Sequence, residues 1–230
     1  MAPTRPTGPP GAIRHAAAGL LVALTAFFAT APFVDALPNG RYVDALLATG
    51  VLAAAVAAIG TRTRPRVIAS VLAAPLVYAY WFQRHHTEGS PFIIFVLLFM
   101  TFVGFVILHL LQFVRDARHV NSEVLCAAVA VYLLLGMLWA AAFTLTARLV
   151  PGSFAGTAME STPLQGFEAL YFSLTTLTTA GFGDIAPTTA PARMLAMLEA
   201  CTGTLYIAVL VARLVSLYRA EAEANPGGAT

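Results

Sequence analysis

The stretch Thr178-Thr179-Ala180-Gly181-Phe182-Gly183-Asp184 decides the expected fold, because it lies between two apolar segments long enough to cross a bilayer. Irregular backbone at membrane depth occurs only where protein buries it or a water-filled path runs beside it, since lipid cannot satisfy its N–H and C=O groups. Glycine adopts backbone conformations that are closed to other residues. Glycine alternating with larger residues therefore allows successive carbonyl groups to face one axis, where they can replace the water around a dehydrated cation.

The composition places the chain in a membrane. Of its 230 residues, 59% are hydrophobic and 10% are charged, and the mean hydropathy is +0.78. That leaves too little polar surface for a soluble protein of this size. All 13 basic residues are arginines, and the net charge of +2 is spread along the loops and not gathered in one basic patch, so nucleic-acid binding is not expected. Cys126 and Cys201 lie in apolar segments, which argues against a disulfide scaffold.

Six segments approach the roughly 20 apolar residues that a membrane-spanning helix needs. They are Ala16 to Val34, Tyr42 to Gly60, Val67 to Phe82, Pro91 to Val114, Val124 to Leu145, and Met194 to Tyr218. A seventh stretch, Leu164 to Thr178, is long enough for only about half of the membrane at 1.5 Å per residue, which is typical of a re-entrant helix. The expected fold class is an all-α membrane protein with six transmembrane helices and one re-entrant helix.

The arginines orient these segments, because short cytoplasmic loops carry the basic excess. With six spans and one re-entrant loop, nine arginines fall on one side and four on the other. The nine are Arg5, Arg14, Arg62, Arg64, Arg66, Arg115, Arg118, Arg213 and Arg219, and the four are Arg41, Arg84, Arg148 and Arg193. We therefore expect a multi-pass protein of the cell membrane with both termini in the cytoplasm.

The segment Thr178–Asp184 is similar to the T-V-G-Y-G-D signature of potassium channels, and we refer to it as the filter segment. The likeness extends beyond these residues. Glu168 to Thr178 resembles the pore helix of that family, Tyr171 and Phe172 resemble its aromatic pair, and Pro187 sits where a proline often follows the filter.

The resemblance covers about Val124 to Tyr218. Gly203 lies twenty residues after Gly183, the spacing at which many of these channels place the glycine hinge of the inner helix. The resemblance implies a subunit of a six-transmembrane, one-pore potassium channel. Such a channel conducts K⁺ passively through a tetrameric central pore, and it is not an enzyme.

The same resemblance assigns roles within the filter segment. Thr179 would supply its hydroxyl and carbonyl groups to the innermost K⁺ site. The carbonyl groups of Ala180, Gly181 and Phe182 would form the sites above it, with Gly183 completing the row. Potassium is then the transported ion, and no organic cofactor is expected. The residues predicted to support the filter segment from behind are Thr175, Thr176, Tyr171, Phe172, Asp184 and Glu199.

Two residues depart from the family signature. Ala180 replaces the usual valine and removes methyl groups that would pack against the pore helix. Phe182 replaces the usual tyrosine and removes a hydroxyl that commonly links the filter to its surroundings. Because filter carbonyl groups point away from these side chains, we still expect a preference for potassium, with weaker rejection of sodium.

The last span carries a row of residues that share one helix face. Thr204, Ile207, Val211 and Val215 recur at spacings of three and four. By the resemblance, this face lines the cavity below the filter. The lower pair, Val211 and Val215, would form a hydrophobic gate that closes by dewetting. Packing against a neighbouring helix is the alternative for any one of these side chains.

Glu199 is a carboxylic acid inside a spanning helix, which makes it a functional hypothesis with a partner to be named. It lies about 140° around the helix from Thr204, and therefore away from the ion path. We expect it to face the pore helix, with Thr175 or Thr176 as hydrogen-bond donor, and to set the stability of the filter. A purely structural carboxyl group is the alternative. Arg213, near the cytoplasmic end, is expected to extend toward lipid headgroups.

The first four helices resemble a voltage-sensor module without gating charges. Between Pro91 and Val114 there is no arginine or lysine, so steep voltage sensing is not expected. His109 in that segment is best explained as a packed, hydrogen-bonded histidine. His85, His86 and Glu88 are the only cluster of metal-ligand types, and their spacing argues against a metal site.

Because one strand of carbonyl groups cannot surround an ion, we predict a fourfold homotetramer in contact with membrane lipids. The predicted domains are a disordered cytoplasmic tail (1–12), a four-helix module similar to a voltage sensor but without gating charges (13–120), a pore domain (121–218) and a short cytoplasmic tail (219–230). A weakly selective monovalent cation channel and a non-conducting regulatory membrane subunit are the alternative functions.

Overall fold

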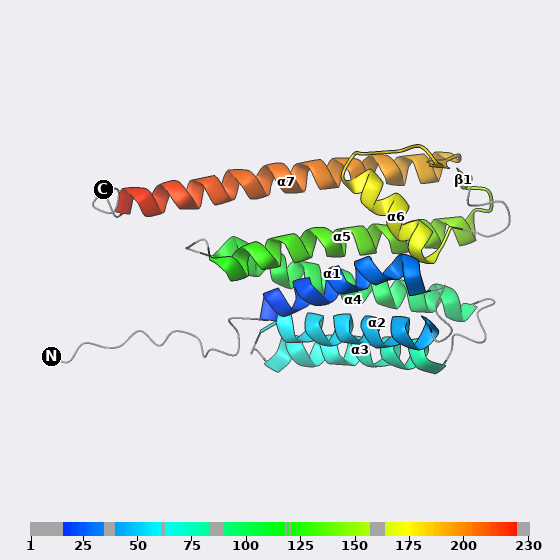
Figure 1. Ribbon diagram of the computed structural model, residues 1–230, viewed down its shortest axis with the longest axis horizontal. Coiled ribbons are helices and arrows are strands. Elements are labelled where there is room, and N and C mark those ends of the chain that lie inside the picture. Colours follow the sequence, from blue (N-terminus) through cyan, green and yellow to red (C-terminus); the bar gives the residue numbers. More distant parts are fainter. Residues whose placement is uncertain are drawn as a thin grey trace.

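The protein is described by a computed structural model that covers residues 16–34, 40–60, 63–82, 90–117, 119, 121–156 and 164–224. Within these ranges the chain forms long helices and one small antiparallel ribbon (Figure 1). The elements are α1 (Ala16–Val34), α2 (Gly40–Ala58), α3 (Thr63–Phe82), α4 (Ser90–Asp116), α5 (Ser122–Leu149), β1 (Phe154–Gly156), α6 (Gly166–Leu177), β2 (Ile185–Pro187) and α7 (Ala190–Ala224).

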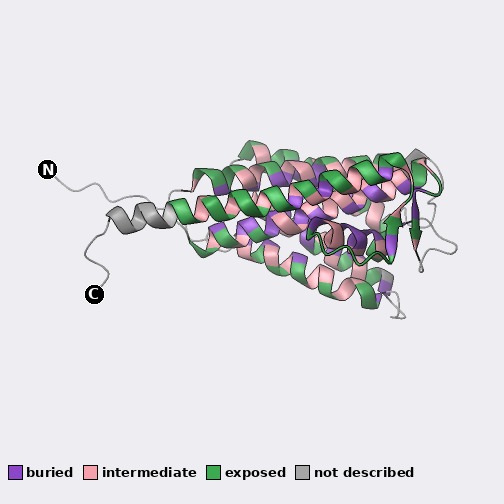
Figure 2. Cartoon of the chain, turned by 90° about the horizontal axis from the view of Figure 1, so that it is seen from above, coloured by how far each residue is buried: buried purple, intermediate pink, exposed green. Residues whose placement is uncertain are grey.

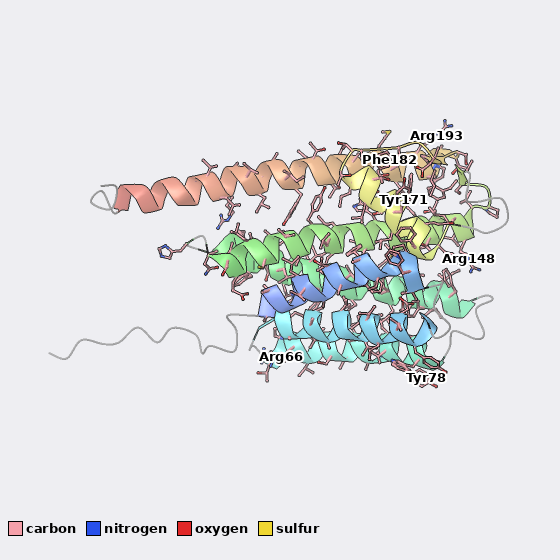
Figure 3. The ribbon with its side chains drawn as sticks, in the orientation of Figure 1. Arg66, Tyr78, Arg148, Tyr171, Phe182 and Arg193 are labelled. Carbon is pink, nitrogen blue, oxygen red and sulfur yellow. The ribbon has the colours of Figure 1, made fainter. Side chains whose placement is uncertain are left out.

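The helices are arranged in successive layers (Figure 1). Helices α2 and α3 form one side, α1 and α4 come next, and α5 separates these four from α7. The short helix α6 lies obliquely between α5 and α7. Helix α1 begins and α7 ends at the same end of the molecule, and α6 lies in the opposite half. The labelled Arg66 lies at the first end, and Arg148 and Arg193 lie at the other (Figure 3).

Four helices are long and apolar enough to cross a membrane. They contain the segments Ala16–Val34, Phe92–Asp116, Ser122–Leu149 and Ala190–Ser216. Helix α2 contributes a shorter apolar segment, Tyr42–Ala58, and α3 does not meet the same measure of length and apolarity. Both are nevertheless helices of 19 and 20 residues that run beside the others. The structure thus gives four spans by length and composition, where the sequence predicted six.

Two hydrophobic cores hold the layers together. The larger core packs the four helices α1, α2, α3 and α4 against the first half of α5, and it contains side chains such as Leu20, Val106 and Leu134. The smaller core lies at the other end, where the rings of Phe143, Phe154 and Phe172 meet edge to face with centroids 4.9–5.7 Å apart. Aromatic pairs in this arrangement add to the stability gained by burial. The second core anchors α6 against α5.

The small ribbon was not predicted from the sequence. Strand β1 pairs antiparallel with β2, with Phe154 opposite Pro187, Ala155 opposite Ala186 and Gly156 opposite Ile185. A side chain at Gly156 would place its Cβ 2.4 Å from the carbonyl oxygen of Asp184, so only glycine fits there. The ribbon links the chain after α5 to the outer end of the filter segment.

The connection from α4 to α5 is short. Helix α4 ends at Asp116, and Asn121 caps α5 by accepting a hydrogen bond of 2.9 Å from the Val124 amide. In the first turn of α5, Glu123 accepts a hydrogen bond of 3.2 Å from the amide of Ala17, at the start of α1. The four-helix module therefore packs on the α5 of its own chain.

Several predictions concern parts of the chain outside the described residues. The tail 1–12 and the cluster of His85, His86 and Glu88 belong to this group, as do the last residues of the predicted tail 219–230. Among the described residues, no group of three or more metal-ligand side chains occurs.

Candidate functional site

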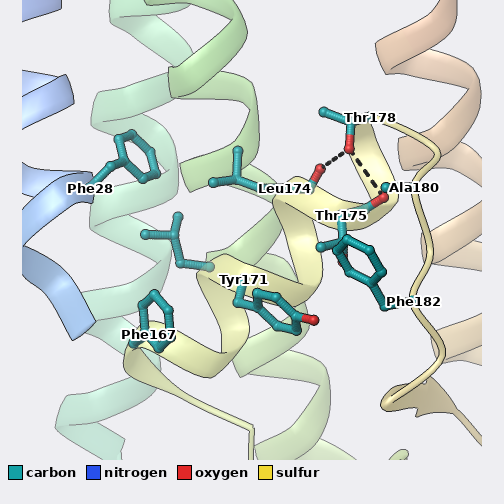
Figure 4. A pocket seen from close by; sticks show the side chains of 9 residues that line it. Phe28, Phe167, Tyr171, Leu174, Thr175, Thr178, Ala180 and Phe182 are labelled. Carbon is teal, nitrogen blue, oxygen red and sulfur yellow. Dashed lines mark hydrogen bonds between the residues drawn. The ribbon is translucent and has the colours of Figure 1, made fainter.

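The filter segment begins where α6 ends. Thr178 follows the last residue of α6 and donates its hydroxyl to the Leu174 carbonyl at 2.7 Å (Figure 4). From there φ is positive at Thr179 (58°), Gly181 (49°) and Gly183 (81°), but not at Ala180 or Phe182. Left-handed conformations are ordinary for glycine and rare for a β-branched residue such as threonine. The sign of φ thus alternates from residue to residue between Thr179 and Gly183.

Two backbone hydrogen bonds orient the filter segment relative to α6. The Thr179 amide donates to the Thr176 carbonyl at 2.9 Å, and the Gly181 amide donates to the Thr175 carbonyl at 3.1 Å. A trans peptide unit carries its N–H and C=O on opposite sides. The carbonyl groups of Thr178 and Ala180 therefore point away from α6. Thr175 and Thr176 thus contact the filter segment through their main-chain carbonyl groups, whereas the prediction used them as hydrogen-bond donors to Glu199.

The filter segment is exposed in the single chain. Residues 178–184 are all exposed, and Figure 2 draws them as a green trace beside the short helix α6. The Phe182 side chain is 73% exposed. The face that carries the outward carbonyl groups is thus open to a partner or to water.

Tyr171 links α6 to the outer half of the filter segment. Its ring stacks on that of Phe182, with centroids 6.4 Å apart and planes inclined by 9°, and Figure 4 shows the two rings side by side. The Asp184 carboxylate is the charged group that acts most strongly on the Tyr171 hydroxyl. Stacking on Tyr171 thus holds Phe182, which lacks the hydroxyl group through which a tyrosine would be fastened.

Ala180 lines an open cleft between the filter segment and α6. Phe182 and residues of α6 form most of its walls, and Phe28 of α1 reaches its edge (Figure 4). The lining is almost wholly apolar, which fits the missing methyl groups predicted from the replacement of valine by Ala180. Phe172, the second member of the aromatic pair, points the other way into the smaller core.

Glu199 faces α6 as predicted, but its partner differs from the prediction. Its side chain is fully buried, and Oε1 lies 2.5 Å from the Ser173 Oγ. Neither Thr175 nor Thr176 reaches it; the Thr175 hydroxyl donates instead to the Phe172 carbonyl at 3.0 Å. Ser173 was missed because the angle around α7 predicts which helix Glu199 faces, and not which residue of that helix meets it. Ser173 also lies 2.7 Å from the Gly136 carbonyl oxygen of α5.

Gly203 makes a close approach to α6. A Cβ at this position would lie 2.1 Å from the Leu177 carbonyl oxygen, a distance that no side chain can tolerate. Helix α7 runs without a break from Ala190 to Ala224, so the predicted hinge lies inside a continuous helix. The Tyr132 hydroxyl of α5 donates to the same Leu177 carbonyl at 3.2 Å.

Helix α7 has two distinct faces. The packed residues recur every three or four positions and are Glu199, Gly203, Tyr206, Leu210 and Arg213. The residues predicted to line a cavity lie on the remaining surface and are all exposed in the single chain: Thr204, Ile207, Val211 and Val215. The predicted cavity face is therefore largely exposed in the single chain.

The sequence predicted that Arg213 extends toward lipid headgroups, but the structure shows it bound to the end of α4. Its guanidinium donates to the carbonyl groups of Val114 and Ala117 at 3.2 and 3.1 Å, and also to that of Arg115. These carbonyl groups belong to the end of α4, where the helix leaves acceptors unsatisfied and the helix dipole favours a positive charge. Arg213 thus joins the inner end of α7 to α4.

One comparison with known proteins gives a match. Residues 122–220 match a family model described as an ion channel, and this stretch runs from the start of α5 into the last turns of α7. No curated protein and no solved structure matches the chain. The match supports an ion-channel function in the membrane for residues 122–220, the part of the chain that holds the filter segment, and it favours a transport protein over an enzyme.

Proposed function

We propose that four copies of this chain form a potassium channel in which the four filter segments surround one axis. The observation that carries the proposal is the alternating backbone of Thr179, Gly181 and Gly183. With two amides donated to α6, the outward face of the segment keeps its carbonyl oxygens available. A cage of such oxygens can replace the hydration shell of K⁺.

The need for four copies follows from the same geometry. A single filter segment supplies one row of carbonyl oxygens, whereas rotational symmetry supplies a closed ring. In this arrangement the exposed face of α7, with Thr204 and Ile207 above Val211 and Val215, lines the cavity beneath the ring. The lower pair would form the hydrophobic gate.

The proposed topology places both termini in the cytoplasm, with six crossings and α6 entering from outside. The common end of α1 and α7 supports this orientation, as does the position of Arg66 relative to Arg148 and Arg193. Helix α4 has no arginine or lysine between Pro91 and Val114, so the four-helix module would not act as a steep voltage sensor.

A weakly selective cation channel is the second candidate, and the cleft beside Ala180 is the observation that favours it. A filter segment with less packing behind it holds its carbonyl ring less rigidly. Such a ring would admit Na⁺ together with K⁺.

Reversal potentials of the reconstituted protein distinguish these candidates. With K⁺ on one side of the bilayer and Na⁺ on the other, a potassium channel gives a reversal potential far from zero. A value near zero would reject potassium selectivity and leave the weakly selective channel. Stable tetramers that move no thallium into liposomes would point instead to a non-conducting subunit.

A pair of glycine variants provides the control. Gly181→Ala places a side chain at a left-handed position and should abolish the flux, whereas Gly104→Ala on α4 meets no atom within 4 Å and should not. If Gly181→Ala conducts like the parent protein, the filter segment is not the conducting site.

A further inference from the structure

Ser173 lies between two buried oxygen atoms behind the filter segment. Its Oγ is 2.7 Å from the Gly136 carbonyl oxygen of α5 and 2.5 Å from Glu199 Oε1 of α7. Both side chains, those of Ser173 and Glu199, are fully buried. Three helices therefore meet at one hydroxyl group.

Whether Glu199 is protonated follows from the single proton that the Ser173 hydroxyl can share with its two oxygen neighbours. A serine hydroxyl carries one proton and can donate only one linear hydrogen bond. If Glu199 were a carboxylate, both neighbours of the Ser173 oxygen would be acceptors, and one of the two contacts would bring lone pairs together without a proton between them. If Glu199 is protonated, Oε1 donates to Ser173 Oγ, which in turn donates to the Gly136 carbonyl. Both short contacts are then hydrogen bonds.

The surroundings agree with a neutral carboxyl group. Among the described residues, no arginine or histidine pairs with Glu199, and Oε2 has no hydrogen-bond partner. The titratable group that faces it from α5 is Tyr132, whose hydroxyl is occupied by the Leu177 carbonyl. An unpaired buried carboxylate would cost several kcal/mol, whereas a neutral carboxyl group leaves only one weak acceptor unsatisfied.

We propose that Glu199 is held in its protonated form and acts as a hydrogen-bond donor that positions the filter segment through Ser173. The protonation of Glu199 does not depend on the function proposed above, whereas its effect on ion conduction rests on that proposed function. Ser173 lies on α6 just before Thr175 and Thr176, whose carbonyl groups hold the amides of the filter segment. Any movement of α6 away from α5 and α7 therefore moves the row of carbonyl groups.

Variants of Glu199 distinguish a role as hydrogen-bond donor from a role of a negative charge. In Glu199→Gln the amide N–H₂ can replace the acid proton, so the current should decay as in the parent channel. Glu199→Ala removes the donor, and Ser173→Ala removes the bridge. Each should make the current decay about tenfold faster, which corresponds to losing about 1.4 kcal/mol. The matched control is Glu168→Gln in the first turn of α6, which should behave like the parent.

Infrared spectroscopy of the purified full-length protein reads the proton directly. The parent should show a carbonyl stretch of a protonated carboxyl group at neutral pH that disappears in Glu199→Gln and remains in Glu168→Gln. A spectrum without this band in the parent would overturn the proposal. So would a Glu199→Gln channel whose current decays as fast as that of Glu199→Ala.

A failure of the proposed channel function can be told apart from a failure of the proposed protonation of Glu199. A protein that conducts no ions would refute the proposed channel function, yet the infrared band and the heat stability of the variants would still decide the state of Glu199. In that case Glu199→Gln should unfold at the temperature of the parent, and Glu199→Ala below it. Equal unfolding temperatures for all three would contradict the proposal, even if Glu199→Ala folds.

Discussion

Thr179 is the only residue other than glycine with a positive φ among those that the structure describes. A β-branched residue in this conformation costs on the order of 1–3 kcal/mol and persists only where its surroundings impose it. Here the amide of Thr179 donates to α6, and the next anchored amide is that of Gly181. The strain therefore lies where the proposed ion path begins, which is where strained backbone tends to serve a function.

Ala180 yields a prediction at the same scale. Ala180→Val would add two methyl groups to the cleft beside the filter segment. Because Ala180 is exposed in the single chain, the gain in stability should be less than about 1.5 kcal/mol, the value for two fully buried carbons at roughly 0.8 kcal/mol each. We expect a higher unfolding temperature and a larger ratio of K⁺ to Na⁺ permeability, measured from reversal potentials. The control is Ala186→Val at an exposed position of β2. An unchanged or smaller ratio in Ala180→Val would mean that the cleft does not limit selectivity.

At the scale of the elements, the residues on the packed face of α7 allow a close contact with α6. Gly203 meets the carbonyl end of α6, and Glu199, one turn earlier, meets Ser173. A glycine and a hydrogen-bonding residue four positions apart thus allow α7 to lie close to α6. The opposite face carries no comparable contact within the described part of the chain.

Gly203→Ala tests this close approach. The added Cβ would force α6 and α7 apart and should destabilise the protein by about 1–3 kcal/mol, as overpacking does. Thermal unfolding of the purified protein measures the effect. Gly104→Ala on α4, which meets no atom within 4 Å, should be neutral or stabilising. If both variants unfold at the same temperature, the contact with Leu177 does not require glycine.

Arg213 gives a second prediction for the elements. Arg213→Gln removes the positive charge that donates to the end of α4 and should cost about 1–2 kcal/mol. Hydrogen exchange of the amides around residues 210–216 should become faster, because the end of α7 loses its attachment. Arg66→Gln, an exposed position of α3, serves as the control. Equal exchange in both variants would show that the attachment is not maintained in solution.

The sequence predicted the helices well, because long apolar runs have few alternatives in a membrane. The bounds of α1 agree at both ends, and α6 falls within the expected Leu164 to Thr178. Helix α7 begins four residues before Met194, since Ala190 and Pro191 suit a first helical turn. The two strands escaped prediction because three residues each are too few to show an alternating pattern.

The contacts behind the filter segment were less predictable than the elements. Hydrogen bonds such as those of Ser173 with Glu199 and of Arg213 with α4 join residues that are 26 to 99 positions apart. Hydropathy and helical angle indicate which face is buried, but the residue met there depends on how far two helices slide along each other. That offset is set by packing at glycines such as Gly136, where a Cβ would lie 2.8 Å from Leu174.

At the scale of the whole molecule, one side of α7 is left uncovered by the rest of the described chain. The smaller core and the four-helix module cover one side of α5 and α6, while α7 keeps large exposed side chains such as Leu205, Val209 and Val211. Figure 2 shows this surface as a mostly exposed face. Fourfold assembly would place it against the cavity and against neighbouring copies.

The assembly predicts both a mass and a dependence on potassium. Native mass spectrometry in detergent should give four times the chain mass of 24.2 kDa. Exchange of K⁺ for Na⁺ should lower the temperature at which the assembly dissociates, because an ion bound on the common axis stabilises only the assembled state. Gly181→Ala should remove this difference. A dimeric mass, or equal protection by Na⁺, would contradict a carbonyl cage at the axis.

The packing of the four-helix module on the α5 of its own chain also bears on biosynthesis. Helices α1 to α4 leave the ribosome first, and the first half of α5 then adds to a core that they have already begun to form. Glu123 meets the start of α1 soon after α4 has ended at Asp116, so the newly inserted chain needs no second copy to bury these helices. If four copies assemble as proposed, each chain can therefore bury these four helices before it meets another copy.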